Sequence, residues 1–394
     1  EAGRAQDLGA ARLVPAGMRR RAGEPEPRAG LGVLAATWNL GGCAPEPGSF
    51  RWPPPGRGGP PAADLVCVAS QEAHYRAPAA PGGARPAALL ARAALAFGAL
   101  AGTVVATACG GGRALGGAAA AAGFFLARYV LAEAQCRRHW LRTVESSLQL
   151  AGGDYELVVC RCLLHMRLAV FARRSARTAG DGLRVSRVAS KKVPTGILGV
   201  WGNKGGLVVR LHLAESGRAG GRECALNFIA VHLAPHEEPL DKRLREREGM
   251  LRRILSACPG SGPRPSVEPL LLDARATVLL GDLNYRVVSK DLPPGAVEAH
   301  RWDELLRHDQ LSVEMGAGRL LRGFREGSLA FPPTYKLRAA FNYVANRTPS
   351  WCDRVLFFTP GGCEQLEIED YSSPAELAGP WDHRPVFATC RLPA

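Results

Sequence analysis

Short apolar segments recur along the chain, and they constrain its fold more than any other feature. Each has the length of a strand and is bounded by turn-forming or charged residues. The predicted strands are Leu31–Thr37, Asp64–Ala69, Tyr155–Cys160, Leu163–Ala172, Arg184–Ser190, Leu207–Leu213, Ala225–Val231, Thr277–Leu280, Val355–Phe358 and Val386–Cys390. Helical patterns predict helices at Arg85–Leu100, Cys136–Leu150, Glu237–Leu255 and Trp302–Leu311. In 394 residues, this alternation is typical of one large α/β domain or of two smaller ones.

Two regions lie outside this pattern. Residues 1–30 are rich in Arg, Gly, Ala and Pro and have little periodicity, so we expect a linker or a disordered lead-in there. A single domain is then expected over residues 31–394, interrupted by a low-complexity Ala/Gly insert near residues 101–122.

One uncharged run, Ala93–Gly110, just reaches the length of a membrane span. It consists largely of Ala, Gly and Thr rather than Leu and Ile. A crossing at this point would also separate Glu72 and Asp282, two candidate site residues introduced below, on opposite sides of a bilayer. We therefore do not expect the run to span a membrane.

The net charge and the cysteine content indicate which partners and which cellular compartment to expect for the protein. Lys and Arg number 50 against 36 acidic residues, a net charge of +14, which favours phosphorylated small molecules, anionic lipid surfaces or nucleic acid as partners. The 11 cysteines form no CxxC pair, which argues against a zinc site or a secreted disulfide framework. No signal peptide is expected at the start of the chain. A reducing, cytoplasmic setting follows from these features.

The segment Gly281-Asp282-Leu283-Asn284-Tyr285-Arg286 follows a predicted buried strand, and there we place the chemistry. The carboxylate of Asp282 can orient a water molecule or accept its proton. Two residues later, on the same face of an extended chain, the Asn284 carboxamide can donate to an oxyanion. The pair is typical of hydrolysis, although Asp and Asn also stabilise turns for local reasons. Taken alone, the segment leaves both interpretations open.

Polar residues follow other predicted strands as well. Asn39 lies after the first strand in a Gly-rich turn, and Glu72 after the second, where a carboxylate is a good ligand for Mg²⁺. Lys204 lies in the loop Gly202–Gly206, whose backbone amides can hold a phosphate. His232 ends the strand Ala225–Val231. Each of these residues, taken singly, could equally be a turn former, a solvated charge or a core histidine.

Two segments near the C-terminus suit recognition of an anion. In one, two prolines stiffen the backbone directly before Tyr335 and Lys336, which favours a fixed phenol donor and a point charge. In the other, Asp382 and His383 precede the last predicted strand. They offer a cation ligand beside an imidazole that can handle protons.

Taken together and in order, these motifs resemble those of the inositol polyphosphate 5-phosphatases, members of the DNase I-like endonuclease/exonuclease/phosphatase superfamily. The matching motifs are TWNLGG, SQE, GNKGG, HLAPH, GDLNYR, PPTYK, RTPSWCDR and WDHRPV. GDLNYR and PSWCDR are the specific ones, whereas NKGG or DH alone would say little. The resemblance covers about residues 31–391.

The resemblance implies a fold that the periodicity alone does not choose. It implies an α/β protein, specifically a four-layer α/β/β/α sandwich of two mixed sheets, with the active site on loops at one edge. The domain at 31–394 would then be a catalytic phosphatase domain. The family requires Mg²⁺.

The resemblance also assigns roles around the metal and the attacking water. Glu72 would be a metal ligand, with Asn39 close to it. Asp282 would orient or deprotonate the water, and Asn284 would steady the phosphoryl oxygens.

The remaining catalytic roles lie at two histidines. His383, oriented by Asp353, would contact the scissile phosphate, and Asp382 and His232 would complete the constellation. Since a phosphate dianion repels hydroxide, we expect neighbouring carboxylates to keep both histidines charged near neutral pH.

The motifs predict how the phosphate next to the scissile one is held. The implied substrate-binding residues are Lys204, Arg286, Tyr335, Lys336, Arg347 and Arg354. In this family Tyr335, Lys336 and Arg347 correspond to the residues that recognise a 4,5-bisphosphate head group. Many relatives carry another basic residue where this chain has Ala345, so we expect a weaker grip on that phosphate.

The implied activity is Mg²⁺-dependent removal of the 5-phosphate from phosphoinositides such as phosphatidylinositol 4,5-bisphosphate, by direct attack of an activated water. The 3,4,5-trisphosphate and soluble inositol polyphosphates remain open as substrates. A nuclease or another phosphodiesterase on the same fold is the alternative enzyme that the net charge favours, but PPTYK and RTPSWCDR count against it. An inactive binding module is the alternative of a different class.

The expected partners follow from that activity. We expect a monomeric catalytic domain that binds a phosphoinositide or inositol polyphosphate, touches anionic membrane surfaces peripherally from the cytosolic side, and does not bind nucleic acid.

Overall fold

The computed structural model describes most of the chain from the first strand to the last. The described residues are 30–53, 60, 63–78, 113–174, 183–196, 202–215, 223–235, 240–258, 271, 273–338, 342–360, 366–374 and 379–392. The predicted lead-in at residues 1–30, except Gly30, the predicted helix Arg85–Leu100 and the uncharged run Ala93–Gly110 lie outside these residues.

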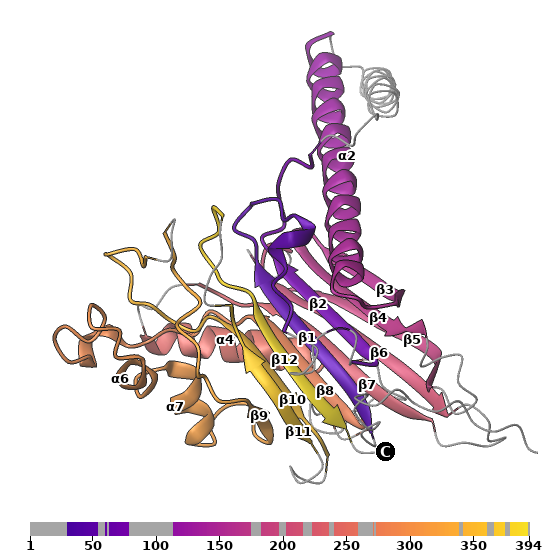
Figure 1. Ribbon diagram of the computed structural model, residues 1–394. Coiled ribbons are helices and arrows are strands. Elements are labelled where there is room, and N and C mark those ends of the chain that lie inside the picture. The colour runs from indigo at the N-terminus through magenta and orange to yellow at the C-terminus, as the bar shows by residue number, and fades with distance from the viewer. Residues whose placement is uncertain are drawn as a thin grey trace, which may run out of the picture.

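Two six-stranded sheets form the body of the protein (Figure 1). Sheet A consists of β1 (Leu31–Asn39), β2 (Leu65–Gln71), β3 (Tyr155–Leu163), β4 (Met166–Arg173), β11 (Glu367–Ser372) and β12 (Val386–Leu392). Sheet B consists of β5 (Leu183–Pro194), β6 (Gly205–Glu215), β7 (Cys224–His232), β8 (Ala276–Asp282), β9 (Phe324–Glu326) and β10 (Asp353–Phe358). The strand order is β11-β12-β1-β2-β4-β3 in sheet A and β5-β6-β7-β8-β10-β9 in sheet B.

Both sheets are mixed. In sheet A, β1 is parallel to β2 and antiparallel to β12. In sheet B, β7 is parallel to β8, and β8 is antiparallel to β10. All the strands predicted from the sequence are present, with ends shifted by a few residues. The short β9 and the charged β11 were not predicted, because neither carries the apolar run that identifies a buried strand.

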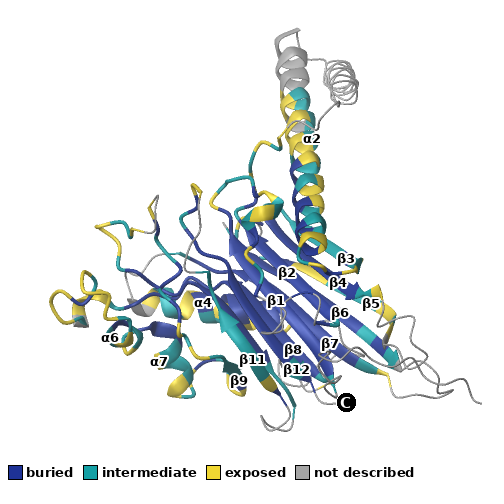
Figure 2. Ribbon diagram, in the orientation of Figure 1, coloured by how far each residue is buried: buried dark blue, intermediate teal, exposed yellow. Residues whose placement is uncertain are grey.

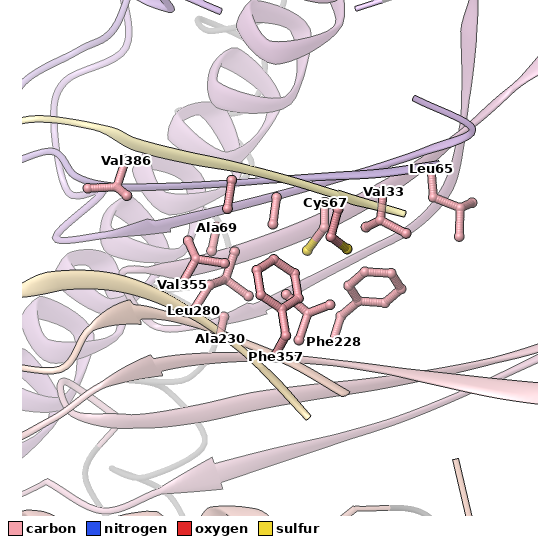
Figure 3. Close-up of a cluster of buried hydrophobic side chains, with 14 of the residues drawn as sticks. Val33, Leu65, Cys67, Ala69, Phe228, Ala230, Leu280, Val355, Phe357 and Val386 are labelled. Carbon is pink, nitrogen blue, oxygen red and sulfur yellow. The ribbon is translucent and has the colours of Figure 1, made fainter. Parts of the chain in front are cut away.

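The main core lies between the two sheets and is apolar from both sides (Figure 3). Val33 and Leu65 of sheet A face Phe228, Leu280 and Phe357 of sheet B, and all five are at least 96% buried. Side chains alternate along each strand, so one face of sheet A lines this core while the other is free to bind a helix. Burial of each such side chain stabilises the folded state by roughly 1.5–3 kcal/mol relative to leaving the side chain exposed to water.

Helix α2 (Arg113–Leu150) covers the outer face of sheet A with its C-terminal half. Trp140, Val144 and Leu148 recur at helical spacing and pack on the outward-facing residues Leu34 and Val66. Its N-terminal half extends beyond the sandwich (Figure 1). The side chains described between residues 122 and 131 are exposed or partly exposed (Figure 2).

Helix α4 (Leu240–Leu255) covers the outer face of sheet B. Leu251 and Ile254 pack on Val208, Ile229 and Leu279. Of the charged residues of the helix, Arg247 is buried and donates to Ala234 O at 3.0 Å, whereas Lys242, Arg245 and Arg252 are exposed. With α2 on the opposite side, the layers are α/β/β/α, which confirms the fold class expected from the resemblance.

Two helices differ from their predicted bounds. Helix α2 begins at Arg113, well before the predicted Cys136, and so takes in part of the expected Ala/Gly insert; small residues carry no apolar pattern that would reveal it. The predicted helix Trp302–Leu311 is broken into α6 (Trp302–Leu306) and α7 (Gln310–Gly316).

The break between α6 and α7 has a local cause. Asp309 adopts extended backbone angles and caps α7, accepting hydrogen bonds from the backbone N–H of Ser312 at 3.0 Å and from its hydroxyl at 2.8 Å. The same carboxylate pairs with the buried Arg354 at 2.8 Å.

Two 3₁₀ turns, Pro47–Ser49 and Ser289–Asp291, complete the described helical structure. No helix in the described part of the chain is long and apolar enough to cross a bilayer.

Candidate active site

Neighbouring strands of sheet B place polar residues side by side at one edge of the sheet. Gly205, the residue after Lys204, pairs with His232, His232 pairs with Asp282, and Asp282 pairs with Asp353. The register of β6, β7, β8 and β10 therefore gathers four predicted site residues that lie far apart in sequence.

The ends of β1 and β2 complete this edge from sheet A. Asn39 and Gln71 are partners at the last pair of these parallel strands, and Glu72 follows directly. Asn39 is 99% buried, and its Nδ2 donates to Asp282 Oδ2 at 2.9 Å. This hydrogen bond joins the two sheets at the site.

A glycine precedes Asp282 because the strands approach closely there. Gly281 has φ +142°, and a Cβ at this position would lie 2.0 Å from the carbonyl oxygen of Val231. Only glycine tolerates both conditions. The backbone of β8 can thus pass β7 and present Asp282 at the edge.

Asp282 and Asn284 form a compact unit. The N–H of Asn284 donates to Asp282 Oδ1 at 3.0 Å, and Asn284 Nδ2 donates to Leu233 O at 3.1 Å. Asn284 has φ +57°, a conformation that Asn adopts more readily than most residues. Its Oδ1 accepts from Arg286 Nη2. Both hydrogen-bonding atoms of the carboxamide are therefore engaged, and the predicted contact with phosphoryl oxygens would require its Nδ2 to be shared.

His383 is oriented as predicted. Its Nδ1 lies 2.7 Å from Asp353 Oδ2, which also accepts from the Thr334 hydroxyl at 2.7 Å. Burial alone would lower the pKa of His383, but the Asp353 carboxylate, with Asp282 and Asp382, raises it to about 9. His383 is thus an imidazolium at neutral pH, and within the described residues its Nε2 makes no hydrogen bond.

His232 has the opposite electrostatic environment. Its Nε2 contacts Lys204 Nζ and lies 3.4 Å from Asp282 Oδ2 and 3.7 Å from Glu72 Oε1. Burial and the Lys204 ammonium lower the pKa of His232, against the opposing effect of Asp282 and Glu72. The expectation that both histidines are charged near neutral pH is therefore wrong for His232.

Asp282 itself is an ionised carboxylate. Burial opposes its ionisation, but the interaction with His232 and the positive charges of His383 and Lys204 hold the pKa of Asp282 well below its usual range. Burial also lowers the pKa of the Lys204 ammonium, although Asp282 and Glu72 oppose this shift.

Oxygen donors for a hard cation gather beside this carboxylate. Glu72, whose side chain is 40% exposed, lies next to His232 and Lys204. Asn39 Oδ1 accepts from the N–H of Gly41 at 3.0 Å, and a Cβ at Gly41 would come within 2.6 Å of Asp382 Oδ1. Carboxylate and amide oxygens are the donors that Mg²⁺ takes. The residues present therefore fit such an ion.

Asp282, Asp353 and His383 also place potential ligand atoms within 4.8 Å of one another. However, the His383 Nδ1 atom in this group is directed at Asp353, and Asp353 Oδ2 is further occupied by Thr334. In this group, the Asp353 carboxylate orients the His383 ring, and Asp353 and Asp282 together raise the pKa of His383. We therefore interpret these three residues as supporting His383 rather than as binding a metal.

A basic and aromatic rim borders the site. The Tyr335 ring lies 4.5 Å from the His383 ring, centroid to centroid, and the Arg286 guanidinium lies 4.3 Å above the Tyr335 ring. Lys336 Nζ pairs with Asp382 Oδ2 at 3.1 Å. A backbone hydrogen bond from Leu337 N–H to Asp382 O, at 2.9 Å, joins the segment that carries Tyr335 and Lys336 to the segment that carries Asp382 and His383. Tyr335 thus lies beside His383, with Arg286 on its ring and Lys336 at Asp382.

The two other predicted arginines lie differently. Arg347 is exposed on a turn, and its guanidinium forms no ion pair within the described residues. Arg354 is fully buried and binds Asp309 at 2.8 Å and Glu326 at 2.6 Å. The prediction that Arg354 binds substrate is wrong, because its donors are committed to an internal network on the far side of β10.

Sequence reasoning missed Thr334 as a site residue. Its hydroxyl donates to Asp353 Oδ2 and accepts from the Asp353 N–H at 3.2 Å, and its carbonyl accepts from Arg384 N–H at 2.9 Å. The signal was present in the PPTYK motif, where Thr334 is the residue before the predicted Tyr335.

Two mixed sheets packed face to face, with carboxylates, amides and histidines at one edge, define a DNase I-like α/β sandwich. Within that class, the chain belongs to the endonuclease/exonuclease/phosphatase family 2, which it matches over residues 37–389. The superfamily predicted from the motifs is confirmed.

Curated relatives narrow the resemblance to one branch. Type I inositol polyphosphate 5-phosphatase 8 of Arabidopsis thaliana is 32% identical over 244 residues, which are 59% of this chain and 46% of that protein. Type II inositol 1,4,5-trisphosphate 5-phosphatase of Mus musculus is 31% identical over 254 residues, 63% of this chain and 23% of that protein. The chain therefore spans less than half the length of these relatives.

Solved structures confirm the fold. The 5-phosphatase domain of SpSynaptojanin, in complex with inositol (1,4)-bisphosphate and calcium ion, superposes with a TM-score of 0.60 at 22% identity, covering 92% of this chain and 85% of that chain. A Cimex nitrophorin in a ferrous NO complex gives a TM-score of 0.52 at 18% identity, covering 93% and 100%. Since the fold is shared with a nitrophorin, the function has to be argued from the site.

Proposed function

We propose that this chain is a Mg²⁺-dependent phosphomonoester hydrolase that removes the 5-phosphate from phosphoinositides such as phosphatidylinositol 4,5-bisphosphate. The observation that carries the proposal is the arrangement at one sheet edge, where the Asp282 carboxylate lies 2.9 Å from Asn39 Nδ2 and 3.4 Å from His232 Nε2, and where Asp353 holds His383 Nδ1 at 2.7 Å. The 5-phosphatase relatives support the substrate class.

Asp282 orients the attacking water in this proposal. Its carboxylate is held by Asn39 Nδ2 and by the N–H of Asn284, so its oxygen atoms have fixed directions. With its pKa held well below the usual range, Asp282 is a weak proton acceptor. Phosphoryl transfer passes through a loose transition state that needs positioning and charge neutralisation more than a strong base. Orientation is therefore its main contribution.

His383 neutralises charge on the phosphoryl group. Its Nε2–H can donate to a phosphoryl oxygen while Asp353 holds the ring through Nδ1. When bound by Glu72 and Asn39, Mg²⁺ would supply further positive charge at the same group. The neutral His232, whose Nε2 accepts from the Lys204 ammonium, keeps this positive charge beside Asp282 and Glu72.

The rim residues suit the neighbouring phosphate. Tyr335 and Lys336 flank His383 and can contact a phosphate one ring position away from the scissile one. Arg347, exposed and free of ion pairs among the described residues, can reach the same anion from its turn. Arg286 stacks on Tyr335 and keeps the phenol in place.

A lipid substrate sets the location of the enzyme. We infer that the chain acts as a monomer in the cytoplasm, at the cytosolic face of membranes, where its net charge of +14 favours contact with anionic lipid. Soluble inositol polyphosphates and the 3,4,5-trisphosphate can present the same 5-phosphate, so they are included in the substrate panel.

The test is phosphate release from lipid and soluble inositides that carry a 4,5-bisphosphate, a 4-phosphate or a 5-phosphate, with and without Mg²⁺. We expect release only from substrates with a 5-phosphate, only with the metal, and none from Asp282→Ala. Asp273→Ala is the matched control, since Asp273 lies just before β8, away from the end that carries Asp282, and pairs with Arg210 at 2.8 Å.

A plasmid-nicking assay runs beside the panel. Nicking without phosphate release would assign a nuclease to this fold and overturn the proposed specificity. Absence of both activities in a folded, metal-loaded protein would favour the binding module.

A further inference from the structure

Arg167, at the start of β4, is a fully buried arginine outside the constellation described above. Its guanidinium joins three separate segments. It donates to Leu164 O in the turn between β3 and β4 and to Met166 O at the start of β4, to Ala73 O after β2, and to the carboxylate of Glu133 on α2. Among the described residues, no carboxylate other than Glu133 pairs with it.

The peptide at Ala73 is the part of the active-site edge that Arg167 touches. Ala73 follows Glu72 directly, and its carbonyl oxygen accepts from Arg167 Nη2 at 3.2 Å and from Cys136 Sγ on α2 at 3.2 Å. Its N–H donates to His165 O at 2.9 Å. The residue after Glu72 is therefore held from the sheet and from the helix.

Glu72 needs this support. It has φ +51°, a left-handed conformation that a non-glycine residue keeps only when its surroundings hold it there. Its own carbonyl accepts from the N–H of Gly42 at 3.0 Å and of His74 at 2.8 Å. The backbone on both sides of Glu72 is fixed by neighbours, while its side chain is 40% exposed and points its oxygens at the site.

We propose that Arg167 is a positioning residue for the metal site: through Ala73 it fixes the backbone that presents Glu72, and Glu133 holds the guanidinium in place from α2. This inference rests on the proposed function, in which Glu72 is the metal ligand. Partners that orient a ligand in this way typically change metal affinity by about 10- to 100-fold.

Stability alone would not require an arginine here. A buried ion pair can often be replaced by apolar residues without loss of stability, whereas removal of one partner leaves an unpaired buried charge. An apolar pair cannot donate to Ala73 O, however. Replacing Arg167 and Glu133 together by apolar residues should therefore remove the hydrogen bond to Ala73 O and still let the protein fold.

The test measures metal binding without turnover. Mn²⁺ is titrated as the probe into the full chain, and the bound fraction is followed by electron paramagnetic resonance in the absence of substrate. The variants are the double substitution Arg167→Leu/Glu133→Leu, the conservative Arg167→Lys, and Glu72→Gln as the direct loss of the ligand. Thermal unfolding of each variant is recorded in parallel.

Arg173→Leu is the matched control. Arg173 lies on the same strand, six residues after Arg167, and donates to Ala63 O at 2.8 and 3.0 Å. That carbonyl precedes β2, just as Ala73 follows it. The two arginines thus make the same kind of contact at opposite ends of β2, and only one end carries Glu72.

We expect the double variant to unfold cooperatively and to bind Mn²⁺ about 10- to 100-fold more weakly, with Arg167→Lys between it and the wild type and Arg173→Leu unchanged. At saturating Mg²⁺ its rate of phosphate release should recover, because the catalytic groups are intact. Wild-type affinity in the double variant, with binding lost in Glu72→Gln, would overturn the positioning role and leave the proposed function standing.

Two other outcomes also decide the matter. Unchanged binding in Glu72→Gln would remove Glu72 as the ligand and the inference with it. If the double variant does not fold, Arg167→Lys carries the test, and wild-type Mn²⁺ affinity in that folded variant would reject the proposal.

Discussion

Asn39 and Asp282 are 243 residues apart in the chain, yet Asn39 Nδ2 donates to Asp282 Oδ2 at 2.9 Å and joins the two sheets at the candidate active site. Asn39 ends β1 in sheet A, and Asp282 ends β8 in sheet B. The orientation of the carboxylate therefore depends on how the two sheets pack, and not only on the local sequence around it.

Replacing Asn39 with Ala should lower turnover more than it lowers stability. The variant removes a donor that fixes Asp282, so we expect kcat to fall about 10²-fold, as is typical for loss of one positioned group. Loss of a single buried hydrogen bond should reduce the free energy of unfolding by only about 1–3 kcal/mol. Steady-state kinetics and urea unfolding check both values. A variant with wild-type kcat would mean that the bond is structural only.

The candidate site could be predicted in part because its residues end strands. Asp282, His232 and Glu72 each follow an apolar segment, and the register of parallel and antiparallel neighbours brings such ends to one edge. The motif order identified the superfamily, which periodicity could not. The charge states of the two histidines could not be predicted, because they depend on which side chains the fold places beside them.

Arg354 illustrates what the sequence leaves open. It lies in the RTPSWCDR motif beside the site residue Asp353, so it was predicted to bind substrate. Its partners Asp309 and Glu326 are 45 and 28 residues away and give no local signal. The N-terminal extension of α2 was missed for a different reason, since a run of Ala and Gly gives no apolar periodicity that would identify a helix.

The different settings of Arg354 and Arg347 predict opposite effects of mutation. Arg354→Met leaves two buried carboxylates without their partner and should reduce the free energy of unfolding by about 3–5 kcal/mol. Arg347→Ala should change stability by less than about 0.5 kcal/mol and instead raise KM for a 4,5-bisphosphate substrate. Chemical denaturation and kinetics on both variants test the pair. A stable Arg354→Met protein with a raised KM would restore Arg354 as a substrate contact.

Loss of His383 should affect turnover far more than substrate affinity. His383→Gln keeps a side chain of similar size but no charge, so we expect kcat to fall by about 10²- to 10⁴-fold with KM changed only a few-fold. His300→Asn, at an exposed histidine whose ring stacks on Trp302, serves as the control. An unchanged turnover number in His383→Gln would rule out the assigned role.

The charge of His383 also predicts a pH dependence. Its pKa of about 9 in the folded protein lies above the usual value of about 6.5, so the imidazolium persists through neutral pH. Activity that needs this charge should be present below pH 9 and fall as the pH rises through it. The stabilisation from the Asp353 pair has the same sign: it is complete below pH 6.5 and is lost through pH 9. Rates and unfolding measured from pH 6 to 10 check both. A fall in kcat on the alkaline side that is retained in His383→Gln would have to come from another group.

Gly281 and Gly249 predict opposite responses to the same substitution. At Gly281 an added Cβ would lie 2.0 Å from Val231 O, and the backbone has φ +142°, so Gly281→Ala should move β8 from β7 and displace Asp282 or prevent folding. Gly249 lies exposed within α4 with nothing within 4 Å of an added Cβ, so Gly249→Ala should raise the free energy of unfolding by about 0.5–1 kcal/mol. Thermal unfolding of the two variants measures both. A Gly281→Ala protein of wild-type stability and activity would show that the close approach of β7 and β8 is not needed to place Asp282.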